Sequence, residues 1–249
     1  MDHTLIAALE SRLVNAWPAF EVAVAEGWLL RFASGYSKRA NSASPLVPGA
    51  DLDDGLIDHI VRRFERQGIV PTFRLTGLEA PGVEAKLAAR GLVDFEPTLC
   101  MMAPLAGGEE PEPAVQLERA ASPAWIRNAA EAYGGDKADR DILGVIVGRI
   151  RESAAFATLV LDDRPVAWGL GVTERGFTGL YDIVVAPDLR GLGLGRQVVR
   201  SLMTWGREHG ATHAYLQVRE ANEVARSLYG SLGFADAYRY THRIPPPPV

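Results

Sequence analysis

Arg190-Gly191-Leu192-Gly193-Leu194-Gly195 is a short glycine loop, and the segments on either side of it predict how it is held. The preceding residues, Thr178–Val185, are rich in β-branched and aromatic side chains and predict a strand. In residues 196–209, which follow, apolar side chains recur at helical spacing. A strand, a glycine loop and a helix in this order direct backbone N–H groups and the positive end of a helix dipole toward one point. Such a point suits a phosphate or pyrophosphate, and Arg190 adds a fixed positive charge there.

The spacing of the glycines excludes two common nucleotide-binding loops. The dinucleotide pattern G-x-G-x-x-G requires glycine where this chain has Arg196. The Walker pattern requires Gly-Lys-Ser or Gly-Lys-Thr, which this loop lacks. The pattern that the segment does contain is V-x-P-x-x-R-x-x-G-x-G, formed by Val185, Pro187, Arg190, Gly193 and Gly195.

A second pattern lies downstream, where a predicted strand at 214–218 leads into a predicted short helix at 222–231. It is N-x-x-A-x-x-L-Y-x-x-x-G-F, formed by Asn222, Ala225, Leu228, Tyr229, Gly233 and Phe234. In this order and at this separation, the two patterns resemble the GCN5-related N-acetyltransferase (GNAT) superfamily over roughly residues 114–245. The resemblance implies a fold of the α/β (α+β) class, in which helices flank a mixed, mostly antiparallel sheet.

The resemblance also implies a reaction and a coenzyme site. An acyl group, most often acetyl, passes directly from acetyl-CoA or another acyl-CoA to an amine, and no metal takes part. The pantetheine is expected to pair with the backbone of Ile183, Val184 and Val185 like an added strand. Asn222 suits the N-cap of the last helix and is expected to contact the coenzyme as well. The residues implied to anchor the pyrophosphate are Arg190, Gly191, Leu192, Gly193, Leu194, Gly195 and Arg196.

Three residues are candidates for the chemistry. The backbone N–H of Val185 can polarise the thioester carbonyl, as an oxyanion donor does. Tyr229 stands where the family has its usual proton donor to the thiolate, and it also counts among the coenzyme contacts. Asp182 is the best-placed general base, with Glu174 and Glu220 in reserve. Structural alternatives remain open, since Tyr229 can be a core ring with its hydroxyl at the surface and Asp182 a solvated acid.

A repeated spacing predicts that the fold occurs twice in the chain. Pro187, Gly210 and Gly233 follow one another at intervals of 23 residues. Pro45, Gly68 and Gly91 do the same, 142 residues earlier, and the segments between these marks alternate between helical and strand patterns in the same order. The sequence therefore predicts two GNAT-like units.

The N-terminal copy lacks the residues of the coenzyme loop. In the repeat alignment, Pro48 stands opposite Arg190, and Asp51 and Asp53 stand opposite two of the loop glycines. Proline cannot donate an N–H, and two carboxylates repel a pyrophosphate. Ala80 and Leu87 replace Asn222 and Tyr229. We therefore expect a degenerate domain at 1–105 without a coenzyme-binding loop, a linker rich in proline, glycine and acid at 106–113, and a catalytic domain at 114–249.

Composition limits the partners and the location. The net charge of −5 argues against a general attraction to nucleic acid or to an anionic membrane. No apolar run approaches the roughly 18 residues of a membrane-spanning helix, and the N-terminus lacks the features of a signal peptide. Cys100 is the only cysteine, so no internal disulfide can form and a cytoplasmic location is expected. The five scattered histidines show no metal-binding spacing, and we expect no metal.

The leading hypothesis is an acyl-CoA-dependent N-acyltransferase that acts on a small-molecule or peptide amine as a monomer or a homodimer. The alternative is a non-catalytic module that binds acyl-CoA and regulates or stabilises a partner. No pattern in the sequence indicates which amine is the acceptor.

Overall fold

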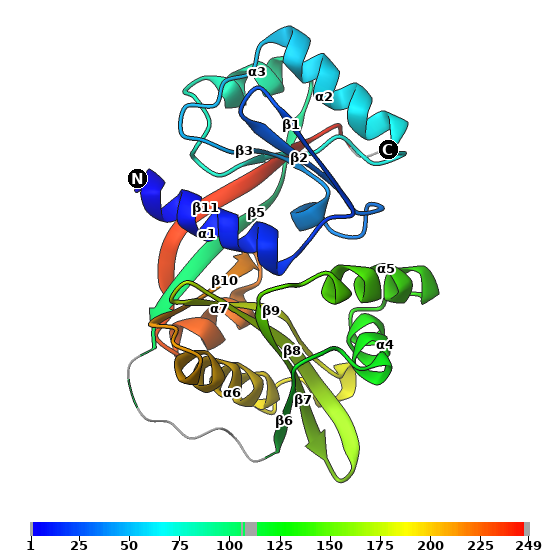
Figure 1. Ribbon diagram of the computed structural model, residues 1–249, viewed down its shortest axis with the longest axis vertical. Helices are drawn as coiled ribbons and strands as arrows, with labels where there is room; N and C mark the ends of the chain where they lie inside the picture. The colour runs from blue at the N-terminus through cyan, green and yellow to red at the C-terminus, as the bar shows by residue number, and fades with distance from the viewer. Residues whose placement is uncertain (1, 106, 108–113, 247–249) are drawn as a thin grey trace. The chain divides into compact units, whose positions relative to one another are not determined.

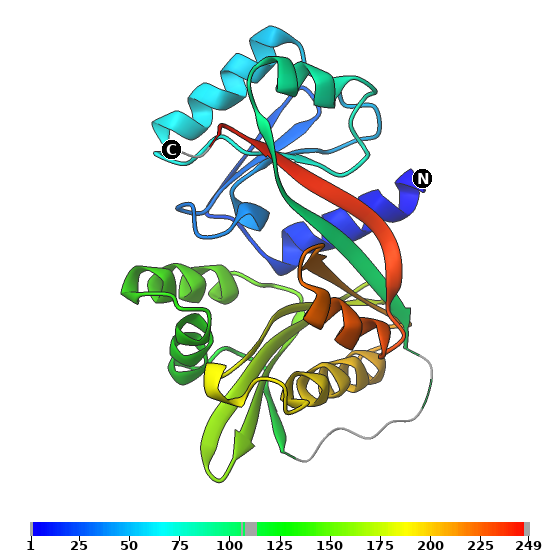
Figure 2. The same ribbon diagram turned by 180° about the vertical axis from the view of Figure 1, so that it is seen from behind.

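The computed structural model describes residues 2–105, 107 and 114–246, and its contacts divide the chain into two compact units (Figure 1; Figure 2 shows the view from behind). Unit 1 comprises Met1–Cys100, Val218–Asn222 and Asp236–Val249. Unit 2 comprises Met101–Gln217 and Glu223–Ala235. The predicted linker at 106–113 lies outside the described residues except for residue 107.

Unit 1 contains a sheet of strand order β1-β2-β3-β4-β11-β5. In this sheet β3 and β4 are parallel, whereas β1, β2 and β3 are joined as antiparallel neighbours. Its elements are α1 (His3–Ala16), β1 (Glu21–Ala25), β2 (Trp28–Phe32), the 3₁₀ turn η1 (Lys38–Ala40), β3 (Ala43–Pro45), α2 (Asp54–Arg66), β4 (Phe73–Leu75), α3 (Val83–Ala89), the first part of β5 (Val93–Pro104) and nearly all of β11 (Ala235–Ile244).

Unit 2 contains a sheet of strand order β5-β10-β9-β8-β7-β6, to which β5 contributes its last residues. Here β9 and β10 are parallel and β6 to β9 are antiparallel neighbours. Its elements are β6 (Val115–Glu118), α4 (Pro123–Ala132), α5 (Lys137–Gly148), β7 (Ser153–Leu161), β8 (Arg164–Glu174), β9 (Phe177–Val185), the 3₁₀ turn η2 (Pro187–Leu189), α6 (Leu194–Glu208), β10 (His213–Arg219) up to Gln217, and α7 (Glu223–Gly230).

The two units repeat one topology. In unit 1 the chain leaves β3, forms α2, returns as β4 parallel to β3 and continues into α3. In unit 2 it leaves β9, forms α6, returns as β10 parallel to β9 and continues into α7. Each parallel pair is short, with registered partners only at Ala43 and Phe73 in unit 1 and over 213–216 with 177–180 in unit 2. The mixed, mostly antiparallel fold and its duplication are confirmed.

The last strand of each sequence half lies in an unexpected place. β11, which ends the second half, belongs to unit 1, where Thr241 to Arg243 pair with Leu75 to Phe73 of β4. The end of β5 belongs to unit 2, where the N–H of Leu105 donates to the carbonyl of Thr212 over 2.8 Å. The sequence analysis assigned all of 114–249 to one domain, whereas contacts group 218–222 and 236–249 with unit 1. Alternation along β11 fixes which side chains face inward, but it carries no information about which sheet the strand joins.

Unit 1 is held by an apolar core and a buried polar network. Leu56, Ile57, Ile60 and Phe64 of α2 pack on one face of the sheet, against residues that include Trp28. Helix α1 begins at a capping aspartate, Asp2, whose carboxylate accepts from the N–H groups of Thr4 and Leu5, and it buries Ile6, Leu9, Leu13 and Ala16.

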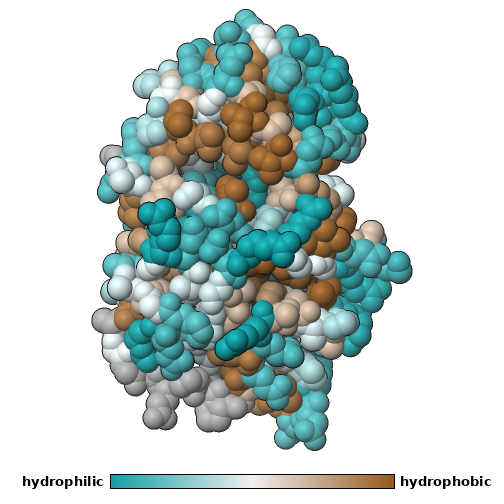
Figure 3. Space-filling view, viewed as in Figure 1, coloured by the Kyte–Doolittle hydropathy of each residue, from teal (hydrophilic) through white to brown (hydrophobic). Residues whose placement is uncertain are grey.

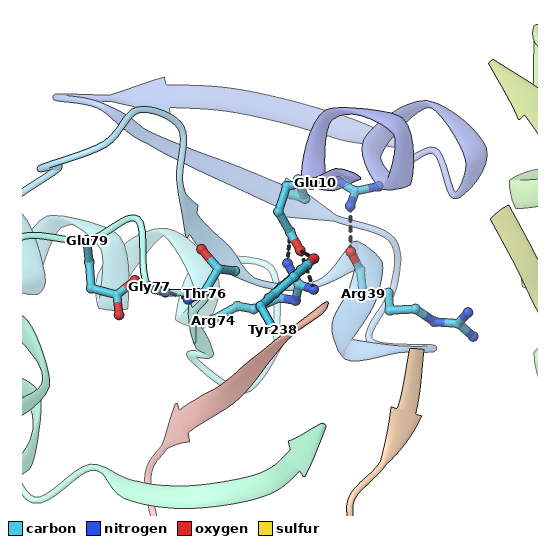
Figure 4. A network of polar contacts seen from close by, with 8 residues as sticks. Glu10, Arg39, Arg74, Thr76, Gly77, Glu79 and Tyr238 are labelled. Atoms are coloured by element: carbon cyan, nitrogen blue, oxygen red, sulfur yellow. Dashed lines mark hydrogen bonds and ion pairs between the residues drawn. The ribbon is translucent and has the colours of Figure 1, made fainter. Parts of the chain in front are cut away.

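The polar network joins α1 to β4 and β11 (Figure 4). Glu10 accepts two hydrogen bonds from the guanidinium of Arg74 and one from the hydroxyl of Tyr238. The side chain of Arg74 is 1 % exposed, and its guanidinium lies 3.8 Å from the centre of the Tyr240 ring. Because these contacts come from three segments distant in sequence, this ion pair ties the first helix and the last strand into unit 1.

Removing the carboxylate of Glu10 should leave the buried guanidinium of Arg74 without its counter-charge. We expect Glu10→Ala to lower the free energy of unfolding by about 3–5 kcal/mol, because loss of one partner of a buried pair leaves the other charge uncompensated. Urea unfolding measures this, with Glu65→Ala on the exposed side of α2 as the control. Adding Arg74→Met to Glu10→Ala should recover most of the loss. If the free energy of unfolding of Glu10→Ala lies within about 0.5 kcal/mol of the parent's, the usual range for surface substitutions, the ion pair does not stabilise unit 1 as described.

Candidate active site

A β-bulge interrupts the pairing of β9 with its antiparallel neighbour β8. Leu170 of β8 pairs with Tyr181, but Trp168 pairs with Val184, so Asp182 and Ile183 share the position opposite Gly169. Asp182 has a φ of 48°, in the left-handed region that a non-glycine residue adopts only at a cost of about 1–3 kcal/mol. Bulges and residues of this kind concentrate beside active sites, where they redirect backbone groups. The bulge therefore shifts the register of β9 against β8 at Asp182 and Ile183, and the ladder resumes where Val184 pairs with Trp168 and Val185 with Ala167.

Gly169 is what makes room for the bulge, and the sequence analysis did not single it out. A Cβ on Gly169 would lie 2.7 Å from Cδ1 of Ile183 and 2.7 Å from Cγ1 of Val198 on α6. No side chain larger than hydrogen fits between the bulge and the helix. The sequence carries a signal for this, because Gly169 and Gly171 alternate within β8, and glycines inside a strand indicate a bulge or a close approach.

The glycine loop leads into an uncapped helix. Gly191 and Gly193 have φ of 83° and 77°, which glycine adopts without the cost that other residues meet. Helix α6 begins at Leu194 with Gly193 at its N-cap, and no side chain caps this end. The N–H of Arg196 donates to the carbonyl of Gly193 over 3.1 Å, so the donors before Arg196 and the positive end of the helix dipole are what this end offers a ligand. The predicted strand, loop and helix around the loop are confirmed.

The arginines of the loop differ in their contacts. Arg190 donates hydrogen bonds to the carbonyls of Val185 (3.3 Å) and Ala132 (3.4 Å). It therefore fixes the start of the loop to the end of β9 and to α4, in addition to placing a positive charge there. Arg196 donates from Nη2 to Oγ of Ser231, 2.7 Å away, next to the end of α7. Within the described part of the chain neither guanidinium is paired with a carboxylate. The nearby acid Asp188 is paired with Arg164 instead, and the hydrogen bond from Arg164 lowers the pKa of Asp188.

Tyr229 lies near the end of α7 and is 8 % exposed. Its ring packs edge-on against Phe234, with 5.9 Å between ring centres. Burial raises the pKa of its hydroxyl to about 12, so the group stays protonated at neutral pH and acts as a donor. Within the described part of the chain no hydrogen bond of this hydroxyl is found, and it is not one of the fully buried polar atoms that lack a partner, so the hydroxyl oxygen is accessible although the ring is buried. α7 also reaches the loop, since a Cβ on Gly195 would lie 3.7 Å from Cδ2 of Leu228.

The remaining predicted site residues are spread more widely. Asp182 is 7 % exposed on the bulge, and Glu174 ends β8. Glu220 is paired with Arg239 over 3.2 Å in unit 1. Asn222 directly precedes α7, as an N-cap would, and its N–H donates to the carbonyl of Arg219 over 2.9 Å; its contacts group it with unit 1. Of the three acids considered as a base, only Asp182 lies on the bulge.

Within the described ranges, no cluster of three or more histidine, cysteine, aspartate or glutamate residues is arranged to hold a metal ion. Nor does any described helix combine the length and the apolar character needed to cross a membrane.

A parallel strand pair joined by a helix, a bulge beside it and a glycine loop that opens the helix define a GNAT N-acetyltransferase, here in a tandem arrangement with a degenerate first half. The model of the family "Probable histone acetyltransferase Rv0428c C-terminal" matches residues 4–243, and the chain belongs to this family. A relative from Bacillus subtilis, "Uncharacterized N-acetyltransferase YobR", is 29 % identical over 245 residues, which cover 96 % of this chain and 98 % of that protein.

Solved structures share the fold. The "GCN5-related N-acetyltransferase from Kribbella flavida" superposes with a TM-score of 0.68 at 16 % identity, covering 99 % of this chain and 96 % of that one. A "Tandem GNAT protein from the clavulanic acid biosynthesis pathway" superposes with a TM-score of 0.59 at 14 % identity, covering 97 % of this chain and 89 % of that one. Both matches extend over nearly the full chain, so the likeness includes the degenerate first half.

The loop geometry predicts the effect of a charge at Gly193. Gly193→Asp would place a carboxylate and a Cβ at the N-terminus of α6, where an anion is expected to bind. We expect the affinity for coenzyme A to fall more than tenfold, about 1.4 kcal/mol. The fold should be retained, because a Cβ there meets no atom within 4 Å and the backbone strain at a φ of 77° costs only about 1–3 kcal/mol. Isothermal titration calorimetry measures this.

Gly210→Asp is a matched control, since Gly210 follows the other end of α6 with a φ of 85° and equally open surroundings. Equal affinities of Gly193→Asp and the parent protein would show that the loop does not anchor the coenzyme.

Proposed function

We propose that this protein transfers an acetyl group from acetyl-CoA to a primary amine, and that unit 2 carries the reaction. The observation that carries the proposal is the combination of a bulged β9 and an uncapped, glycine-opened α6 in that unit. The acetyltransferase names of the relatives support it, and nothing in them favours the alternative of a non-catalytic acyl-CoA-binding module.

In this proposal the loop from Arg190 to Arg196 binds the pyrophosphate. The N–H groups at the start of α6 supply directed donors, and the two arginines supply charge. The pantetheine arm lies along Ile183, Val184 and Val185, beyond Leu180, where the register of β9 with β10 ends. Asn222, just before α7, is proposed as a further contact to the coenzyme.

The chemistry requires one bond to form and one to break. The amine nitrogen attacks the thioester carbonyl carbon, a C–N bond forms, and the C–S bond breaks to release a thiolate. The N–H of Val185 is proposed to stabilise the negative charge that develops on the carbonyl oxygen. The bulge residue Asp182 is proposed to accept the proton that the amine loses, and Tyr229 to donate a proton to the departing sulfur.

The elevated pKa of Tyr229 fits this role. With a pKa of about 12 the hydroxyl is protonated at any physiological pH, so it always presents a hydrogen to a thiolate. A thiol is more acidic than this hydroxyl, with a pKa of about 8.5 for cysteine. Full transfer of the proton from Tyr229 to the thiolate is therefore uphill, and the hydrogen bond from the hydroxyl supplies much of the stabilisation of the departing sulfur. The ring is fixed by burial against Phe234, which orients the hydroxyl.

Unit 1 is proposed to have a structural role and to bind no coenzyme in this mode. At the start of α2, which matches α6, the carboxylate of Asp53 accepts from the N–H of Leu56 over 2.7 Å and so caps the helix. Asp51 is paired with Lys86 over 2.7 Å. These contacts fill the helix N-terminus with carboxylates that belong to the protein.

The acceptor is proposed to be a small-molecule or peptide amine. Shorter matches include the "[Ribosomal protein bS18]-alanine N-acetyltransferase" of Salmonella typhimurium, 35 % identical over 79 residues, and the "Streptothricin acetyltransferase" of Streptomyces lavendulae, 36 % identical over 91 residues. Those names cover a protein and a small molecule, so both kinds of acceptor belong in a screen. A cytoplasmic location and a monomeric or homodimeric state stay predictions.

The direct test is release of free thiol from acetyl-CoA in the presence of a panel of amines, amino acids and peptides. We expect at least one amine to raise thiol release well above the rate of hydrolysis alone, with acetylated amine as the second product. A folded protein that binds coenzyme A but shows neither transfer nor hydrolysis would contradict the proposal.

Tyr229→Phe tests the proton donor, because it keeps the ring and removes only the hydroxyl. If the hydroxyl acts in the transition state, kcat should fall while the KM for acetyl-CoA changes little. General acid catalysis is worth about 10²–10⁴-fold, and we expect the low end or somewhat less because a thiolate leaves readily. Tyr133→Phe, at an exposed tyrosine next to α4, is the control. A kcat within twofold of the parent, where chemistry limits the rate, would assign Tyr229 to packing alone.

A further inference from the structure

Asp182 differs from the other left-handed residues of unit 2 in where it lies. Within the part of the chain that the structure describes, three further non-glycine residues of this unit have a positive φ, namely Asp162, Asp163 and Arg175. All three are exposed and lie in the turns before and after β8, and the hairpin of β7 and β8 ends in hydrophilic surface in Figure 3. Asp182 instead lies inside β9 and is 7 % exposed. A strained conformation persists inside a strand only where the surrounding structure enforces it.

Packing on the α6 face of the sheet holds the residue that follows Asp182. The side chain of Ile183 occupies the space that a side chain at position 169 would need, next to Val198 of α6. That space exists because residue 169 is glycine. The chain just after the bulge is therefore fixed between β8 and the helix.

The residue that precedes Asp182 points to the opposite face. Leu180 is registered with Gly171, and a Cβ on Gly171 would point at α6, so Leu180 faces the helix and Tyr181 faces away from it. On that face the tyrosine side chain runs back over Gly179, where a Cβ would lie 2.4 Å from the hydroxyl oxygen of Tyr181. Glycine at position 179 is what leaves room for this side chain.

A buried hydrogen bond fixes the ring of Tyr181 in that position. Its hydroxyl lies 2.6 Å from the hydroxyl of Tyr215 on β10, so one of the two donates to the other, and the rings meet edge-on. Both side chains are buried. Tyr215 is registered with Gly179, and the registered pairing of β9 with β10 ends one residue later, at Leu180 and Leu216. The bond therefore joins the two strands where their pairing ends.

The neighbours of Asp182 are thus held on opposite faces of the sheet. Resting on the proposed function, we propose that Tyr181 and Tyr215 are positioning residues of the reaction. Their hydrogen bond, together with the packing of Ile183 against α6, keeps Asp182 in its left-handed conformation. That conformation determines the direction of the Asp182 carboxylate and of the backbone that leads to the N–H of Val185. The tyrosines act through these groups and are assigned no contact with the coenzyme or the amine.

Tyr215→Phe tests the assignment, because it keeps the ring and removes one hydroxyl of the pair. With the amine that the thiol-release panel identifies, kcat should fall about fivefold, the factor that corresponds to one ordinary hydrogen bond. The Kd for coenzyme A should stay within about twofold, because the glycine loop supplies its main anchor. In the protein without ligand, backbone amide exchange at residues 182–185 should become about fivefold faster, since the bulge opens more often.

Two comparisons separate positioning from a general loss of stability. Tyr181→Phe should have the same effects, and the double variant should be no slower than either single variant, because the two hydroxyls form one bond. Thr173→Val is the matched control, since it removes a buried hydroxyl pair of the same sheet, Thr173 with Thr178 over 2.7 Å, away from the bulge. Its kcat and its exchange at 182–185 should match those of the parent. Thermal unfolding confirms that each variant is folded.

If either kcat or the exchange at 182–185 stays at the parent value in Tyr215→Phe, the inference is overturned and the proposed function stands. Equal changes in Thr173→Val would also overturn it, because the effect would then be a general loosening of the sheet. A parent protein that acetylates no amine would contradict the proposed function, and the role of the pair in the reaction with it. Amide exchange needs no substrate and would still report whether the pair holds the bulge.

Discussion

The extra residue in β9 is the constraint on which the candidate site depends. A regular ladder would pair every residue from Phe177 to Val185 with β8, but the bulge at Asp182 and Ile183 breaks that register. The left-handed conformation of Asp182 costs free energy that regular pairing would not, and Gly169 is needed to admit the side chain of Ile183 beneath α6. The segment that follows the bulge leads within a few residues to the glycine loop. One local irregularity thus positions both the proposed oxyanion donor and the loop that precedes α6.

The two units show how one topology can keep or lose a binding site at a helix N-terminus. Both have a helix that connects two parallel strands. In unit 2 the helix starts at a glycine and no side chain caps it, whereas in unit 1 the helix starts at Asp53, which satisfies a backbone donor itself. Because an internal carboxylate and an external phosphate compete for the same donors, a cap of this kind stabilises the helix and removes the site. The two halves differ in this loop and also at Ala80 and Leu87, which stand where the second half has Asn222 and Tyr229.

Most elements of the fold and of the candidate site were predictable from the sequence, and the features that were not predicted share one physical cause. The glycine loop, the helix behind it and the repeat of 23 residues follow from local patterns, which is why the strand, loop, helix and duplicated fold are confirmed. The placement of β11 beside β4, the bulge opposite Gly169 and the contacts of Arg190 with two carbonyls depend on partners distant in sequence. The roles assigned to Asp182 and Tyr229 stay predictions.

Hydrogen exchange of the backbone amides with and without acetyl-CoA tests the central claim most directly, because it reports on both halves of the chain in one experiment. The account predicts slower exchange at Ile183 to Val185 and at the loop and first turn of α6, residues 191–196, when the ligand is bound. It predicts no comparable change at residues 43–54, the matching segment of unit 1. Protection of residues 43–54, or no protection at 183–196 under saturating ligand, would contradict the claim that one bulged strand and one uncapped helix hold the coenzyme.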